Sequence, residues 1–210
     1  MATVEQLATE PRFTLRGVPW EVYERLRDIE ANCHVRMTYD RGTLEMMVNS
    51  NRHENVTKLI GQLIEAFTAE LNIPRRSFRA TTWKRRDIDK GLEADECYYI
   101  HSHERVSSRP EVDLAEDPPP DLALEVVFTH GDVNKMSIYA ALGVPEVWHW
   151  EDGELQSLRL DEGQYVPCET SFNLPMLRVK DLEEFLDPMR ALDESAWINS
   201  FRGWVRERFR

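Results

Sequence analysis

The sequence lacks the features that would assign it to a membrane or secreted class. No apolar run approaches the length of about 18 residues that marks a membrane-spanning helix. The first residues, MATVEQLATEPRFT, lack the basic start and apolar core of a secretory signal. Cysteine is scarce, and Cys33, Cys97 and Cys168 are too widely spaced to suggest a disulfide framework or a zinc-binding pair. We therefore expect a cytoplasmic protein that does not enter a membrane.

An excess of basic residues is also missing. The chain has 26 Lys and Arg against 38 Asp and Glu, which gives a formal net charge of −12. A protein that coats nucleic acid would normally be basic, so tight non-specific DNA binding is disfavoured. A nuclease is not excluded, because its acidic residues hold metal ions that meet the phosphates.

The chain has no internal repeat, no low-complexity tract and no linker that would divide it. Its 210 residues, 41% of them hydrophobic, are enough for one α/β domain with a full core. We expect residues 1–11 to form a flexible arm and residues 12–210 to form the single domain.

The most informative stretch is residues 118–150, which begins with three prolines. Residues 122–128, LALEVVF, are apolar apart from Glu125, a pattern typical of a strand covered on both faces. Residues 132–142 have the pattern of a helix that ends at Gly143. A further strand is expected over residues 144–150. The stretch predicts a β-α-β unit with one acid inside its first strand.

The other segments predict helices and strands around this unit. Helices are expected over residues 18–29, 51–71, 181–186 and 193–209. Strands are expected over residues 33–39, 43–48, 78–86, 96–100, 154–160 and 164–169. Turns are expected at residues 40–42 and 87–91, and a polar loop over residues 101–120.

Three acids stand at or within the expected strands. Burying a carboxylate without a partner costs several kcal/mol, so Glu125 should meet a metal ion, a cation or an opening in the core. Asp121 lies four residues earlier, about 13 Å along the strand at ~3.3 Å per residue, and the two cannot easily chelate one ion. Asp95 lies at the start of a neighbouring strand and can meet Glu125 side by side. Two such carboxylates suit Mg²⁺ or Mn²⁺.

Lys135 falls in the first turn of the helix that follows this strand. A cation is unfavourable there because it opposes the helix dipole. A nearby carboxylate or phosphate would compensate for that.

Several stretches together resemble the Uma-two endonuclease family, a branch of the PD-(D/E)XK restriction-endonuclease-like superfamily. The resemblance covers about residues 12–177 and rests on the order and spacing of residues 50–56, TTWKRRD at 81–87, GLEADE at 91–96, PDLALEV at 120–126, Lys135, and YAALGVPEVW at 139–148. It implies a mixed central sheet flanked by helices, with Asp95 and Glu125 as metal ligands and Lys135 as the catalytic lysine. His53 and Glu54 fall where members usually carry a polar residue of the first helix.

The sequence departs from the superfamily pattern at one position of the motif. Val127 stands where a lysine would follow two residues after the acid, so Lys135 has to reach back from the helix, as in this branch generally. Ala94 replaces a common proline, and residues 128–131, FTHG, replace a serine-rich turn. These two changes affect the expected loop geometry more than the site.

Each candidate also has a structural alternative. Asp95 could cap a strand, Asp121 could end a loop, and Lys135 could be a solvated helix lysine. His53 and Glu54 fit ordinary chemistry at a helix N-terminus. A polar loop explains His101 and His103, and His130 is a weak candidate. Two readings remain open for the basic run: its members either contact phosphates or form a solvated strand edge. They are Lys84, Arg85 and Arg86.

These observations and the resemblance predict a Mg²⁺- or Mn²⁺-dependent endonuclease that acts on DNA. The alternative is a catalytically silent family member that serves as a DNA-binding or protein-interaction module. A third possibility is a hydrolase of small phosphoesters, which would need a closed pocket. We also expect a homodimer, because Trp197, Phe201 and Trp204 share one side of the last helix.

Overall fold

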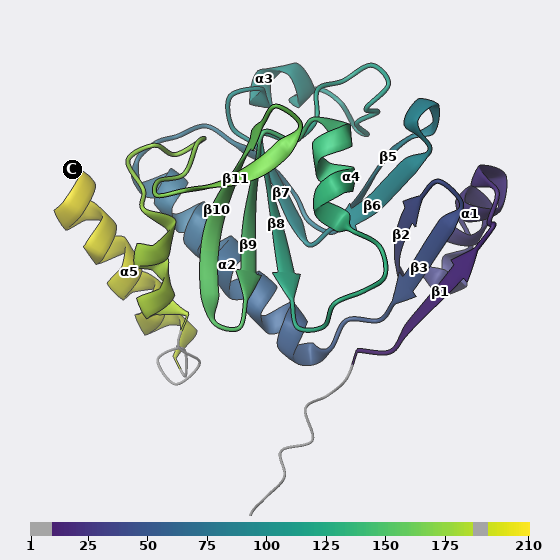
Figure 1. Ribbon diagram of the computed structural model, residues 1–210. Helices are drawn as coiled ribbons and strands as arrows, with labels where there is room; N and C mark the ends of the chain where they lie inside the picture. The colour runs from purple at the N-terminus through teal and green to yellow at the C-terminus, as the bar shows by residue number, and fades with distance from the viewer. Residues whose placement is uncertain (1–9, 187–192) are drawn as a thin grey trace, which may run out of the picture.

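The computed structural model describes residues 10–186 and 193–210, whose strands form two sheets (Figure 1). One sheet has five strands in the order β1-β3-β2-β6-β5, and the other has six in the order β11-β10-β9-β8-β7-β4. The greater part of the predicted arm, residues 1–9, lies outside the described residues. Glu10, which the prediction placed in the arm, is buried.

The six-stranded sheet contains the predicted β-α-β unit. β8 (Leu122–Val127) and β9 (Glu146–Glu151) pair in parallel and are joined through α4 (Lys135–Leu142). Asn134 caps this helix by accepting a hydrogen bond from the Ser137 amide at 3.1 Å. Gly143 ends it with a φ of 80°, which glycine adopts without strain.

The other strands of this sheet pair antiparallel, so the sheet is mixed as expected. They are β4 (Arg76–Phe78), β7 (Glu96–Tyr99), β10 (Glu154–Asp161) and β11 (Gln164–Cys168). Helix α4 covers one face, and α2 (Asn51–Glu70) lies behind the other (Figure 1). The successive side chains of β8 therefore enter two different cores, which explains its continuous apolar run.

The five-stranded sheet is antiparallel throughout. Its strands are β1 (Arg12–Arg16), β2 (Arg36–Asp40), β3 (Thr43–Met47), β5 (Thr81–Arg85) and β6 (Lys90–Ala94). The predicted hairpin turn is present, with positive φ at Arg41 and Gly42. α1 (Trp20–Arg27) covers one face of the sheet, where Trp20 and Tyr23 pack on Tyr39.

The last helix, α5 (Glu194–Phe209), packs along α2 and closes the core on that side. Trp197 and Phe201 are buried there, and Trp204 stacks on Phe201. The homodimer stays a prediction, but Trp197 and Phe201 are used inside the molecule and offer no surface to a second copy.

Several predicted boundaries were wrong. The single strand expected over residues 78–86 is divided between β4 and β5, which belong to different sheets. The expected turn at residues 87–91 is replaced by a short 3₁₀ helix, η2 (Arg86–Ile88), and the start of β6. The sequence KGLEA of β6 gives little strand signal, because it has one large apolar residue. β1 was not predicted either.

Three short helical segments complete the fold. α3 (His103–Val106) lies within the expected polar loop, and η1 (Glu30–Asn32) follows α1. The helix expected over residues 181–186 is the 3₁₀ helix η3 (Val179–Phe185). Among the helices of residues 10–186 and 193–210, none is both long and apolar enough to cross a membrane.

Candidate active site

A cavity of about 420 Å³ lies between the two sheets, beside the loop that connects β8 to α4. Its wall is formed by β1 and β3 on one side and by residues 127–136 on the other. Glu125, from the middle of β8, lies in its lining although the side chain is almost fully buried. We refer to this cavity as the Glu125 cleft.

Two side chains of α4 bind Glu125. Lys135 donates from Nζ to Oε1, and the Tyr139 hydroxyl donates to Oε2 at 3.0 Å. Lys135 is the first residue of the helix, and Tyr139 lies one turn later. The structure therefore brings Lys135 back to the acid of the preceding strand, as the sequence required.

Asp95 lies between β6 and β7, directly beside the Glu125 backbone. The last antiparallel pair of β7 and β8 is Glu96 with Leu124, so Asp95 comes opposite Glu125 one step further on. Asp95 Oδ2 accepts a hydrogen bond from the Val126 amide at 2.9 Å and lies 3.3 Å from His53 Nε2. Asp95 is thus fixed opposite Glu125, but it is buried and lies outside the lining of the cleft, to which Glu125 belongs.

Glu125, Asp95 and Lys135 act on one another's charge. Burial raises the pKa of Glu125, and the charge of Asp95 adds to this, against the opposing effect of Lys135. Burial would also lower the pKa of Lys135, but the two carboxylates outweigh it and the pKa is raised. Glu125 is therefore subject to opposing influences, from burial and Asp95 on one side and from Lys135 on the other.

Asp95 itself is kept ionised. Burial disfavours its charged form, but His53 and Lys135 outweigh burial and hold the pKa of Asp95 below its usual value. The pKa of His53 is raised by Asp95 in return, against the effect of burial. His53 therefore lies behind the site and holds Asp95 in place.

A second ion pair in the cleft was not expected from the sequence. Arg12 on β1 binds Glu45 on β3 at 2.5 Å and donates to the Thr129 carbonyl at 2.8 Å. The other oxygen of Glu45 accepts from the Asp132 amide at 2.7 Å. Arg12 and Glu45 thus join the five-stranded sheet to the loop between β8 and α4. The signal that could have found Glu45 is a lone acid between apolar residues of a strand, as at Glu125.

The loop passes so close to this ion pair that Gly131 has no room for a side chain. A Cβ atom there would lie 2.1 Å from Arg12 Nη1 and from Glu45 Oε2. Glu10 adds a further contact, because it accepts from the Thr129 hydroxyl at 3.2 Å. The wall of the cleft is therefore packed against charged groups from two strands, β1 and β3, and from the chain before β1.

All three accessory candidates, His53, Glu54 and Asp121, lie outside the cleft lining. Asp121 accepts hydrogen bonds from the amides of Ile100 and Ser102 at 2.6 and 2.9 Å, which is the loop-ending role given as its alternative. The Glu54 side chain is half exposed and accepts from Asn49 at 2.8 Å. Among the histidines, His130 lines the cleft and pairs with Glu151 at 2.6 Å.

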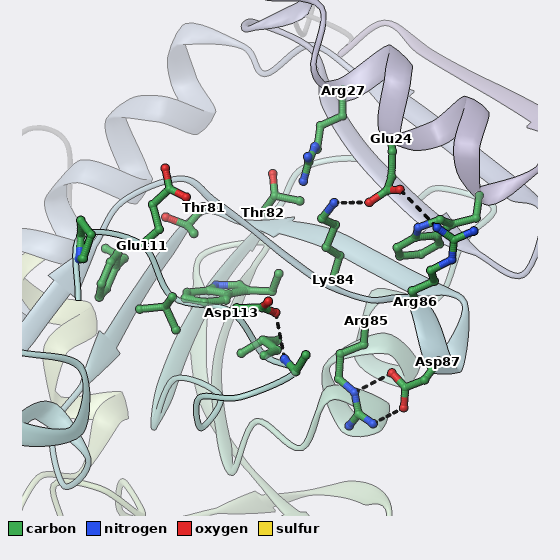
Figure 2. Close-up of a pocket in the computed structure, with 17 residues that line it drawn as sticks. Glu24, Arg27, Thr81, Thr82, Lys84, Arg85, Arg86, Asp87, Glu111 and Asp113 are labelled. Atoms are coloured by element: carbon green, nitrogen blue, oxygen red, sulfur yellow. Dashed lines mark hydrogen bonds and ion pairs between the residues drawn. The ribbon is translucent and has the colours of Figure 1, made fainter.

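The basic run lines a different and larger groove, of about 1120 Å³, between β5, α1 and residues 110–115. Figure 2 shows Lys84 and Arg86 directed toward Glu24, while Arg85 is turned toward Asp87. Each cation is therefore paired with an acid, and none belongs to the lining of the Glu125 cleft. This arrangement favours the alternative of a strand edge over phosphate contacts.

The donors in the cleft fit a small, hard cation. The described part of the chain holds no group of three or more His, Cys, Asp or Glu side chains arranged around one point. Mg²⁺ needs no such cage, because it is commonly bound by one or two carboxylates, with waters and substrate phosphates completing its shell. Asp95 and Glu125, at neighbouring strand positions, offer two carboxylates of this kind.

Comparisons with known proteins bear on the family and the fold of the chain. The family model Uma2, described as "Putative restriction endonuclease", matches residues 20–192. The fold is similar to the crystal structure of "a putative nuclease belonging to DUF820" from Anabaena variabilis ATCC 29413, with 12% identity and a TM-score of 0.50, over 80% of this chain and 90% of that one. Among curated proteins no match was found. The restriction-endonuclease-like fold expected from the sequence is confirmed.

Proposed function

The chain belongs to the Uma2 family, and we propose that it is a metal-dependent endonuclease that hydrolyses phosphodiester bonds in DNA. One observation carries this proposal. Glu125 lines a cleft and is bound by Lys135, and Asp95 stands opposite Glu125 in the register of the neighbouring strand. This combination supports the proposal, because it offers two carboxylates at neighbouring strand positions and a cation bound to one of them.

Asp95 and Glu125 would hold Mg²⁺ or Mn²⁺ in the cleft. When bound, such an ion polarises the phosphate and lowers the pKa of the attacking water. The chain itself fixes the two ligands: the Val126 amide and His53 hold Asp95, and Tyr139 holds Glu125. Contacts of this kind orient metal ligands and support their affinity.

Lys135 would act on the substrate. Its ammonium lies against Glu125 and close enough to Asp95 to lower the pKa of that acid. A cation held there stabilises negative charge that develops on the phosphate, without having to reorganise during the reaction. Arg12, on the opposite wall, supplies a second positive charge to the cleft.

The test is cleavage of plasmid DNA and of single- and double-stranded oligonucleotides, with Mg²⁺, with Mn²⁺ and with EDTA. Metal-dependent products are expected from the parent. Glu125→Ala and Lys135→Met should each lose a factor of about 100 or more, as is typical when a preorganised charge is removed. Glu194→Gln is the matched control, because Glu194 is exposed and pairs with Lys58 away from the cleft.

The competing proposal is a silent member that binds DNA or a protein. It draws on the fact that both oxygens of Glu125 are already bonded, to Lys135 and Tyr139. A parent protein that cleaves none of these substrates with either metal would favour the silent member. Equal cleavage by the parent and Glu125→Ala would show that the activity does not depend on Glu125 and belongs to another site. The cytoplasmic location and the homodimer stay predictions.

A further inference from the structure

The outer edge of β1 has no partner in the described part of the chain. β1 is the last strand of its sheet and pairs with β3 alone (Figure 1). Its side chains Phe13 and Leu15 are 67% and 44% exposed. Val48, which is also exposed, is hydrogen-bonded to Pro11 just before β1. An edge strand with exposed apolar groups is a template for pairing with another strand.

The hydrogen-bond pattern shows which backbone groups face outward. The Val48 amide donates to the Pro11 carbonyl at 3.2 Å, and bonding alternates along an antiparallel pair. Phe13 and Leu15 therefore direct their backbone groups to β3. The amide and carbonyl groups of Arg12, Thr14 and Arg16 point to the outer edge.

We infer that β1 pairs antiparallel with β1 of a second copy of the chain, about a two-fold axis at Thr14. The sequence of the strand, Arg-Phe-Thr-Leu-Arg, is nearly symmetric about this residue. In that register Thr14 pairs with Thr14 of the partner subunit through both backbone bonds. Phe13 then lies opposite Leu15 of the partner subunit, which gives apolar cross-strand pairs on one face.

The same register sets Arg12 opposite Arg16 of the partner subunit on the other face. Like charges directly opposite each other are destabilising. Here each arginine has its own acid: Arg12 binds Glu45 at 2.5 Å, and Arg16 lies 3.5 Å from Asp132. The charge of each arginine is therefore compensated within its own subunit. Repulsion between the arginines does not prevent the two β1 strands from pairing.

The interface has a consequence for the two clefts. A two-fold axis between antiparallel edge strands runs perpendicular to the joined sheet, so equivalent faces stay on the same side. Arg12 belongs to the lining of the Glu125 cleft. Both clefts would then open on the same side of the dimer, close to its axis.

The experiment is the oligomeric state of the full chain over a range of concentrations, measured by sedimentation velocity or light scattering. Thr14→Pro removes one outward amide from each subunit and leaves the bonds to β3 intact, which an edge strand tolerates. It should weaken the dimer about a hundredfold or more. Thr14→Ala keeps the amide and should dimerise like the parent. Unchanged melting of Thr14→Pro at low concentration checks that the monomer is folded.

A second variant and a shortened chain make the outcome decisive. Phe13→Ser should also weaken the dimer, because it removes the apolar cross-strand pairs without touching the backbone. A parent that is monomeric at all concentrations overturns the inference, as does a Thr14→Pro variant that dimerises like the parent. A parent that dimerises only after residues 1–9 are removed also overturns it, since the edge would then be covered by the chain itself. None of these measurements requires nuclease activity.

Discussion

At the scale of single residues, Glu125 is unusual because burial and Asp95 both act against its charge, while Lys135 supports it. A carboxyl whose pKa is raised in the folded state reduces stability progressively as pH rises above its normal range near 4.5. Glu125→Gln removes this effect and keeps the shape of the side chain, with one carbonyl oxygen to accept from Lys135 or from Tyr139. At neutral pH in EDTA the variant should be as stable as the parent or more so, measured by thermal or urea unfolding.

Lys135→Met is the contrasting change, because it leaves two buried carboxylates without their cation. Breaking a buried ion pair from one side typically costs about 3–5 kcal/mol, so this variant should be clearly less stable in EDTA. With Mg²⁺ or Mn²⁺ at a hundredfold excess over the dissociation constant, the parent should gain about 2.7 kcal/mol, and Glu125→Gln much less. A Glu125→Gln variant that loses stability in EDTA, with both proteins indifferent to metal, would make Glu125 a structural acid.

At the scale of elements, the loop between β8 and α4 depends on its fit to the Arg12–Glu45 ion pair. Gly131→Ala would place a methyl group 2.1 Å from charged atoms of both residues. Overpacking of this kind usually costs about 1–3 kcal/mol, and the loop that carries Lys135 would have to move. We expect lower stability in urea unfolding, together with reduced cleavage.

Gly203→Ala is the matched control for that change. Gly203 lies inside α5, and a Cβ atom there would meet nothing within 4 Å. The same substitution should therefore stabilise the protein by about 0.5–1 kcal/mol, since alanine favours a helix over glycine. Equal effects at the two positions would show that the loop does not rely on the close contact at Gly131.

At the scale of the whole molecule, the question is how DNA could approach a protein with a net charge of −12. The largest basic run, residues 84–86, lies in a groove apart from the Glu125 cleft, and each cation there has an acidic partner. Each phosphate contact contributes about 0.9 to the salt dependence of binding. Replacing Lys84, Arg85 and Arg86 together by alanine should therefore change the slope of log K against log salt by less than about one.

Fluorescence anisotropy with a labelled duplex at several salt concentrations measures this slope. A fall of nearly three would instead place all three side chains on phosphates, and the DNA would then have to extend from the cleft to the groove in Figure 2. Arg12→Ala is the comparison, because Arg12 lines the cleft itself. It should lower DNA affinity, although part of its effect will come from Glu45 losing its partner.

The sequence alone determined the β-α-β unit and its acid, because these depend on local signals. An apolar run, a capped helix and a terminating glycine specify β8, α4 and Gly143 within a few residues of one another. Glu125 was noticeable because a lone acid in such a run has to find a partner. The position of Asp95 followed from the expectation that its strand neighbours β8.

Only the tertiary structure decided which charged side chains line the cleft and which form ion pairs or hydrogen bonds elsewhere. Arg12 meets Glu45 and Thr129 from separations of 33 and 117 residues, and no local pattern encodes such contacts. The division of residues 76–85 between two sheets likewise depends on how the sheets pack, and it carries Lys84 to the groove beside α1. Asp121 is used to end a loop because the amides of Ile100 and Ser102, which follow β7, donate to its carboxylate. The type of each side chain limits the interactions that are possible at its position. The packing of the two sheets decides which of those interactions form.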